Sequence, residues 1–196
     1  IPYWNFFGNG GGPFYFIYYL FRLLDPLMVF PVLIIKLFPK INILHLYLNF
    51  TIVRELFYVF GIGVLVCRLF RSFWIQITLA VVFTWLNGFE ISDMMRRDSV
   101  TWTPWFFLCL YQAYRLRSNS YLWLGFYLLG ILVGASSYHM AYTLVFSLLL
   151  LFFYTLFHFK EVSQFICEFK RTLVGGCLLV IALILPLVSI YFDRQN

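Results

Sequence analysis

The stretch LFYVFGIGVLVC, residues 56–67, contains no charged side chain and is closed by Arg68 and Arg71. A long apolar run that ends in arginine is typical of a transmembrane helix ending at the cytoplasmic face. Upstream, His45, Asn49, Arg54 and Glu55 lie within the same helical stretch. The sequence therefore predicts a long helix over residues 41–70, with a polar outer half and an apolar inner half.

The composition of the whole chain points to the same class of protein. Of the 196 residues, 63% are hydrophobic and 11% are charged. Soluble domains are about 45–50% apolar and about 25% charged, and this chain has too few polar residues to cover its apolar surface. We therefore expect an all-α, polytopic transmembrane helical bundle. The basic residues are scattered, which disfavours a nucleic-acid interface.

Further apolar runs lie on both sides of the first. The sequence predicts helices over residues 72–89, 104–116, 121–135, 138–159 and 172–191, with polar loops at 90–99 and 160–170. Residues 14–24 and 27–38 are interrupted by proline and are too short to cross about 30 Å of hydrocarbon, so they are expected to be interfacial or re-entrant helices. Two parts result: an extracytoplasmic loop with interfacial helices (1–40) and a bundle of about six spans (41–196).

The basic residues orient this predicted bundle. If Arg68 and Arg71 are cytoplasmic, alternation of the spans brings five more basic residues to that side, and the charged loop after residue 89 to the other. This arrangement satisfies the positive-inside rule and predicts an integral membrane protein. The five residues are Arg115, Arg117, Lys160, Lys170 and Arg171.

The charged loop is the strongest candidate site. Arginine binds phosphate through two parallel hydrogen bonds, and a nearby carboxylate could act as a general base or bind a divalent metal. The alternative is an ordinary solvated loop whose charges pair with one another. The residues concerned are Glu90, Asp93, Arg96, Arg97 and Asp98.

Other polar residues allow two interpretations each. Arg54 and Glu55 lie deep in a predicted span, where ionisable groups usually face the protein interior or water. They could line a site, or they could pair with other helices. His139 could contact substrate or carry a proton, or it could be an interfacial residue. Asp25, before Pro26, is favoured as the N-cap of the helix that follows.

Two further patterns bear on packing. Gly130 and Gly134 form a small-xxx-small pattern, which allows a neighbouring helix to approach closely. The four cysteines, without a CxxC or a histidine at ligand spacing, are interpreted as core or lipid-embedded thiols. These residues are Cys67, Cys109, Cys167 and Cys177.

Weak motifs along most of the chain resemble one family. They begin with Pro2-Tyr3-Trp4-Asn5 and Gly10-Gly11-Gly12-Pro13 and continue through Leu44-His45-Leu46, Asn87-Gly88-Phe89, Thr103-Pro104-Trp105, Ala113-Tyr114-Arg115, Tyr121-Leu122-Trp123-Leu124-Gly125, His139 with Tyr142, and Pro186-Leu187. In this order the chain resembles the bacterial YfhO-type membrane proteins, which are similar to polytopic glycosyltransferases of the GT-C class.

The resemblance implies transfer of a sugar from a polyprenyl-phosphate donor on the extracytoplasmic side of the bacterial inner membrane. The lipid phosphate would bind near Arg96 and Arg97, with Arg54, while carboxylates of the charged loop orient the acceptor or a metal. The catalytic base of such proteins is an acid just after the first helix. This sequence opens at Ile1, downstream of that position, so we expect the chain to be a fragment.

Two other functions remain open from the sequence. One is a non-catalytic structural or accessory subunit packed within a larger membrane protein complex, which suits the phenylalanine-rich, weakly charged helix faces. The other is a transporter, which would need polar residues near the midplanes of several helices or an internal repeat. The mainly apolar inner halves of the predicted spans disfavour the transporter.

Overall fold

The computed structural model describes residues 25–38, 40, 42–88, 101–135, 149 and 152–193, and these residues form α-helices without any strand. The predicted helix 14–24 and most of the predicted helix 138–159 lie outside the described residues. The predicted all-helical chain is confirmed over the described residues, and the other predicted helices correspond to observed ones. The exception is the predicted polar loop 160–170, which is largely helix. The helices are α2 (Pro26–Leu37), α3 (Ile43–Leu69), α4 (Phe73–Gly88), α6 (Thr103–Leu116), α7 (Asn119–Ala135), α9 (Phe159–Glu168) and α10 (Lys170–Asp193).

Local sequence explains where two of these helices begin and end. The Asp25 side chain accepts a hydrogen bond from Leu27 N, and Pro26 occupies the first turn of α2, where no amide proton is needed. The predicted N-cap is therefore confirmed. Helix α6 has Pro104 in its first turn and ends at Leu116, and its C-cap residue Arg117 adopts the left-handed conformation with φ 50°. This conformation ends the helix and turns the chain into α7.

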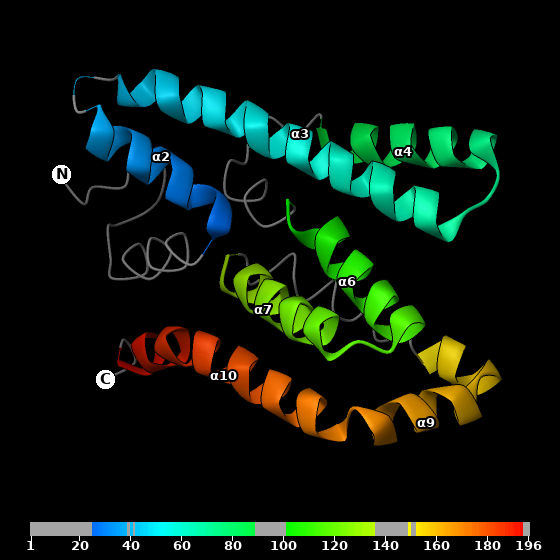
Figure 1. The fold of residues 1–196 in the computed structure, drawn as a ribbon. Coiled ribbons are helices and arrows are strands. Elements are labelled where there is room, and N and C mark those ends of the chain that lie inside the picture. The colour runs from blue at the N-terminus through cyan, green and yellow to red at the C-terminus, as the bar shows by residue number, and fades with distance from the viewer. Residues whose placement is uncertain are drawn as a thin grey trace.

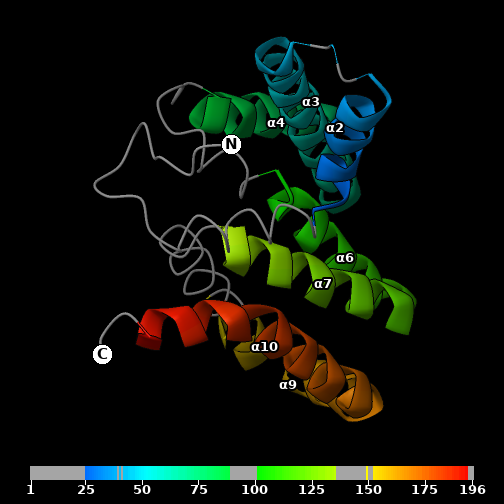
Figure 2. The ribbon, with the colours of Figure 1, turned by 90° about the vertical axis from the view of Figure 1, so that its left-hand side faces the viewer.

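The helices are arranged in three levels (Figures 1 and 2). Helices α2, α3 and α4 form one level, α6 and α7 the middle level, and α9 and α10 the third. Successive levels pack through α3 against α6 and through α7 against α10. Within levels, α3 packs with α2 and α4, and α6 with α7.

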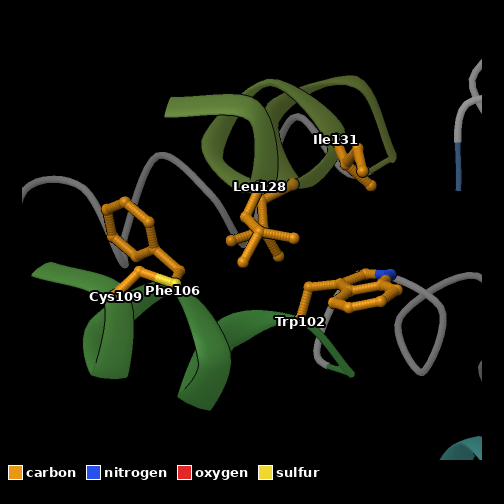
Figure 3. Close-up of a cluster of buried hydrophobic side chains, with 6 residues drawn as sticks. Trp102, Phe106, Cys109, Leu128 and Ile131 are labelled. Carbon is orange, nitrogen blue, oxygen red and sulfur yellow. The ribbon is translucent and has the colours of Figure 1, made fainter. Parts of the chain in front are cut away.

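The largest buried apolar cluster lies between α6 and α7 (Figure 3). Trp102, Phe106 and Cys109 come from the start of α6 and its first turns, and Leu128, Ile131 and Leu132 come from α7. Leu132 is fully buried, so its truncation to alanine should cost about 2–5 kcal/mol of stability. This cluster fixes α6, and with it Trp102, against α7.

Glycines bring α7 and α10 close together. A Cβ atom added at Gly176 would collide with the Phe126 ring, and one added at Gly175 would lie 2.7 Å from the Trp123 ring. On α7, the space at Gly130 is filled by Leu183 of α10. The close helix approach predicted at Gly130 is therefore confirmed, and α10 contributes its own glycine pair.

The transmembrane prediction needs correction. Within the described part of the chain, no helix combines the length and the unbroken apolar character that a bilayer crossing needs. Helices α4, α6 and α7 have 16, 14 and 17 residues, against about 20 for a span, and the 27-residue α3 carries Arg54, Glu55 and Arg68 along its length. This finding contradicts the predicted polytopic transmembrane bundle and the predicted integral location in the bacterial inner membrane.

Candidate functional site

A buried polar cluster joins three helices around Asp25. Its Oδ2 accepts a hydrogen bond from Arg54 Nη2 at 2.6 Å, and its Oδ1 accepts from Trp102 Nε1 at 3.1 Å and from Leu27 N at 2.9 Å. Asp25 is 3% exposed and Arg54 is 5% exposed. The carboxylate therefore connects the start of α2, the middle of α3 and the residue that precedes α6.

The surroundings of this cluster explain how two charges are tolerated inside the protein. The Arg54 guanidinium lies 5.8 Å from the centre of the Phe50 ring and can interact with its negative face. Burial, and then the charge of Asp25, raise the pKa of Tyr127, so this nearby phenol stays neutral. A buried ion pair stabilises a fold only when its hydrogen bonds are well satisfied. Both carboxylate oxygens are engaged here, while Arg54 Nε is buried with no hydrogen-bond partner among the described residues. The geometry is that of a structural junction.

The predicted site residues fall into two groups. Arg54 and Glu55 are described, and Arg54 is turned into the protein and paired with Asp25, in agreement with the pairing interpretation of this residue. Glu55 is half-buried on the same helix. The remaining predicted residues lie outside the described part of the chain, so their joint placement stays a prediction. They are Glu90, Asp93, Arg96, Arg97, Asp98 and His139.

A second polar cluster lies where α6 meets α9, and the sequence did not single it out. Tyr114 donates to Glu161 Oε2 at 2.8 Å and accepts from the Tyr154 hydroxyl at 3.2 Å. The His158 ring stacks on Tyr154 with ring centres 4.4 Å apart. The hydrogen bond with Tyr154, followed by that with Glu161, raises the pKa of Tyr114, because the donated proton is held by the carboxylate.

Arg117 extends this second cluster toward solvent. Its guanidinium lies 5.4 Å from the Tyr114 ring centre and 5.3 Å from that of Phe165, and its Nη1 is 3.4 Å from Glu168 Oε2. The sequence signal that could have revealed this cluster is the run of tyrosines and arginines at 111–117, which recur at helical spacing. Its groups are exposed and bonded to one another.

Metal binding was predicted only through carboxylates of the charged loop. Among the described residues, no group of three or more histidine, cysteine, aspartate or glutamate side chains could hold a metal ion. The four cysteines are free; Cys109 is buried, and Cys67, Cys167 and Cys177 are exposed. The divalent metal therefore stays a prediction for residues 90–98.

A comparison of the chain with protein-family models, with curated proteins and with solved structures finds no match. The resemblance to YfhO-type proteins, and the sugar transfer that it implies, thus stay predictions, and the function has to be argued from the described surfaces.

Proposed function

We propose that this chain is a non-catalytic structural subunit that packs against a partner polypeptide through an apolar face of α10. The observation that carries the proposal is a stripe of four aliphatic side chains, named here the α10 stripe: Val174, Leu178, Ile181 and Leu185. Each of the four is between 55% and 62% exposed.

The spacing of the α10 stripe is that of a helix–helix seam. The intervals of four, three and four residues place all four side chains within about 60° of one another around a helix with about 100° per residue. Alternating intervals of this kind are the spacing by which one helix packs its side chains into the holes of another. A single exposed leucine needs no explanation, but a continuous apolar stripe indicates an interface.

The opposite face of α10 is already occupied within the chain. Gly175, Gly176 and Leu183 face α7 and lie against Trp123, Phe126 and Gly130. Helix α10 lies at the outer edge of the three levels, with α7 on its inner side (Figures 1 and 2). The α10 stripe thus points away from the helix that holds α10 in place, and a partner can cover it without disturbing that packing.

The polar groups of the described residues support a structural role over a catalytic one. Asp25 and Arg54 are buried and hydrogen-bonded to each other at a junction of helices. In the second cluster, the half-buried Tyr114 and the exposed Glu161 are hydrogen-bonded to one another. A catalytic constellation needs a group positioned toward a bound substrate, and these groups are positioned toward their protein neighbours.

The test compares two double variants of the full chain expressed in its native cells. Leu178→Glu with Ile181→Glu places two charges in the α10 stripe. Ile77→Glu with Val81→Glu places two charges at exposed apolar positions of α4 as the matched control. We expect a partner that co-purifies in fixed stoichiometry with the unchanged chain to be lost from the α10 variant and retained by the α4 variant.

Cross-linking supplies the second readout. Cys177 is exposed and lies beside Leu178 on α10. A chain with Cys67→Ser and Cys167→Ser, treated with a thiol cross-linker, should form one defined adduct that includes the partner. A partner that stays bound to the α10 variant, or one lost equally from both variants, would contradict the proposal.

A further inference from the structure

One end of the molecule collects a large positive charge. Arg68 and Arg71 flank the turn between α3 and α4, Arg115 and Arg117 lie at the end of α6, and Lys160, Lys170 and Arg171 lie on α9 and at the start of α10. All of these side chains are exposed. We name these seven residues the basic end.

The fold brings the seven residues of the basic end together from different helices. Figure 1 shows the end of α3, the start of α4, the end of α6 and helix α9 on one side of the molecule. The Tyr111 hydroxyl donates to Arg68 O at 3.2 Å and accepts from Arg115 Nη1 at 3.1 Å, which ties the two arginines to one tyrosine. Thr172 donates to Asn119 Oδ1 at 2.6 Å and joins the start of α10 to the turn after α6.

The acidic side chains of this end do not neutralise it. Among the described residues of this end, the acids are Glu161 and Glu168, which hydrogen-bond to Tyr114 and Arg117, respectively. Seven basic side chains against two acidic ones leave a positive surface. A surface of this sign attracts anions, and it does so less strongly as salt is added.

Large apolar side chains lie beside these charges, and they favour one class of anionic partner over another. Trp74 is 76% exposed at the start of α4, and Phe157 is 83% exposed next to α9. Leu69 and Leu116 are exposed beside Arg68 and Arg115. Tryptophan favours the headgroup level of a bilayer, and phenylalanine and leucine bury their apolar side chains at the boundary between headgroups and acyl chains. Aliphatic side chains do not stack on nucleic-acid bases, but they can insert among lipid chains.

We propose that the basic end is a docking surface for an anionic phospholipid bilayer. The basic side chains contact headgroup phosphates, and Trp74, Phe157 and Leu116 insert at the boundary between headgroups and acyl chains. Binding to a bilayer of this kind needs two signals, apolar insertion and charge, and both occur at this end. The proposal concerns a surface different from the α10 stripe and does not depend on a partner polypeptide.

The experiment measures binding of the full chain to vesicles of two compositions. One set is phosphatidylcholine alone, and the other is an equal mixture of phosphatidylcholine and phosphatidylglycerol. We expect much tighter binding to the mixture, weakening as sodium chloride is raised. Binding to neutral vesicles measures the contribution of apolar contact alone, and equal binding to both sets would overturn the proposal.

Two variants connect this binding to the basic end. The variant with Arg71→Gln, Lys160→Gln, Lys170→Gln and Arg171→Gln should bind anionic vesicles about 10²- to 10³-fold more weakly. The control, Lys36→Gln with Lys40→Gln, removes exposed basic side chains far from this end and should leave binding within about twofold of the unchanged chain. Circular dichroism establishes that both variants fold.

Three further results would overturn the proposal. The first is unchanged vesicle binding by the four-residue variant while it remains folded. The second is an equal loss of binding in the control. The third is displacement of the chain from anionic vesicles by a short oligonucleotide that binds the basic end more tightly, which would assign this surface to nucleic acid.

Discussion

Asp25 accepts hydrogen bonds from groups that stand 2, 29 and 77 residues away along the chain. The first bond caps a helix and is a local effect, which the Asp25-Pro26 pair predicts from sequence. The other two are tertiary contacts with Arg54 and Trp102. The sequence alone leaves open whether Arg54 pairs with another helix. Nothing in the sequence near Trp102 indicates that its indole donates to Asp25, because a separation of 77 residues follows no helical periodicity.

The Asp25→Asn variant tests the ion pair separately from the cap. Asparagine caps helices as well as aspartate does, so the local bond to Leu27 is kept. The variant leaves the charge of Arg54 buried beside a neutral amide, and we expect a loss of about 3–5 kcal/mol in the free energy of unfolding. Urea unfolding measures this loss, and the double variant Asp25→Leu with Arg54→Met should recover part of it. A loss below about 1 kcal/mol would mean that water reaches the pair.

Cys109 should differ from the other three cysteines in reactivity. Burial raises its pKa from 9.0 to about 11, whereas Cys67, Cys167 and Cys177 are exposed. We expect iodoacetamide at pH 8 to modify those three cysteines in the folded chain and Cys109 only after unfolding, as peptide mass spectrometry can show. Equal labelling of all four would contradict the described packing of α6 on α7.

The same shift makes stability depend on pH. The folded pKa of Cys109 lies above the unfolded one, so the unfolded chain loses this proton first as pH rises. The contribution of Cys109 is complete below pH 9.0 and is lost as pH rises from 9.0 toward 11. The Cys109→Ala variant should lack this component of the alkaline loss.

At the scale of the element, two glycines in helices have opposite roles. Gly176 lies against Phe126, while a Cβ atom added at Gly63 would meet nothing within 4 Å. We expect Gly176→Ala to destabilise the fold by about 1–3 kcal/mol through overpacking. Gly63→Ala should stabilise it by about 0.5–1 kcal/mol, because alanine is the better helix former. Urea unfolding of both variants measures the two changes in the free energy of unfolding. A stabilising change for both variants would contradict the close approach of α7 and α10.

Helix α9 is the described helix that the sequence does not predict, and its residues show why. Lys160, Glu161, Gln164 and Glu168 gave this stretch the composition of a loop. Between them, however, Val162, Phe165 and Phe169 recur at helical spacing, and the structure buries Val162 and Phe169. The amphipathic pattern is present in the sequence, but the charged side chains give the stretch a composition that is also typical of a loop. Elsewhere the long apolar runs predicted helices within a few residues of their ends, because little competes with a helix in such sequence.

At the scale of the whole molecule, composition alone predicted the wrong architecture. An apolar fraction of 63% counts apolar side chains but does not show how they are divided among helices. The structure divides them among separate helices and leaves many exposed on the outer faces of α3, α4 and α10. The proposed partner interaction uses the face of α10.

The helices should also differ in local stability. Helices α6 and α7 share the largest buried cluster, whereas α4 packs mainly against α3 and exposes Trp74 and Val81. We expect amide protons of α4 to exchange with solvent faster than those of α7, because fewer buried contacts must open. Hydrogen exchange followed by mass spectrometry measures this order. Equal protection of the two helices would show that a further contact covers α4.

The junction at Asp25 also has a consequence for synthesis on the ribosome. Asp25 and Arg54 leave the exit tunnel well before Trp102, and 77 residues separate Asp25 from this last partner. Helix α3 ends at Leu69, and at about 5–20 residues per second the 33 residues from there to Trp102 correspond to about 2–7 s of elongation. During this interval α2 and α3 have emerged while the indole that completes their junction has not, so a nascent chain stalled before residue 102 should expose this carboxylate and guanidinium to chaperones and proteases.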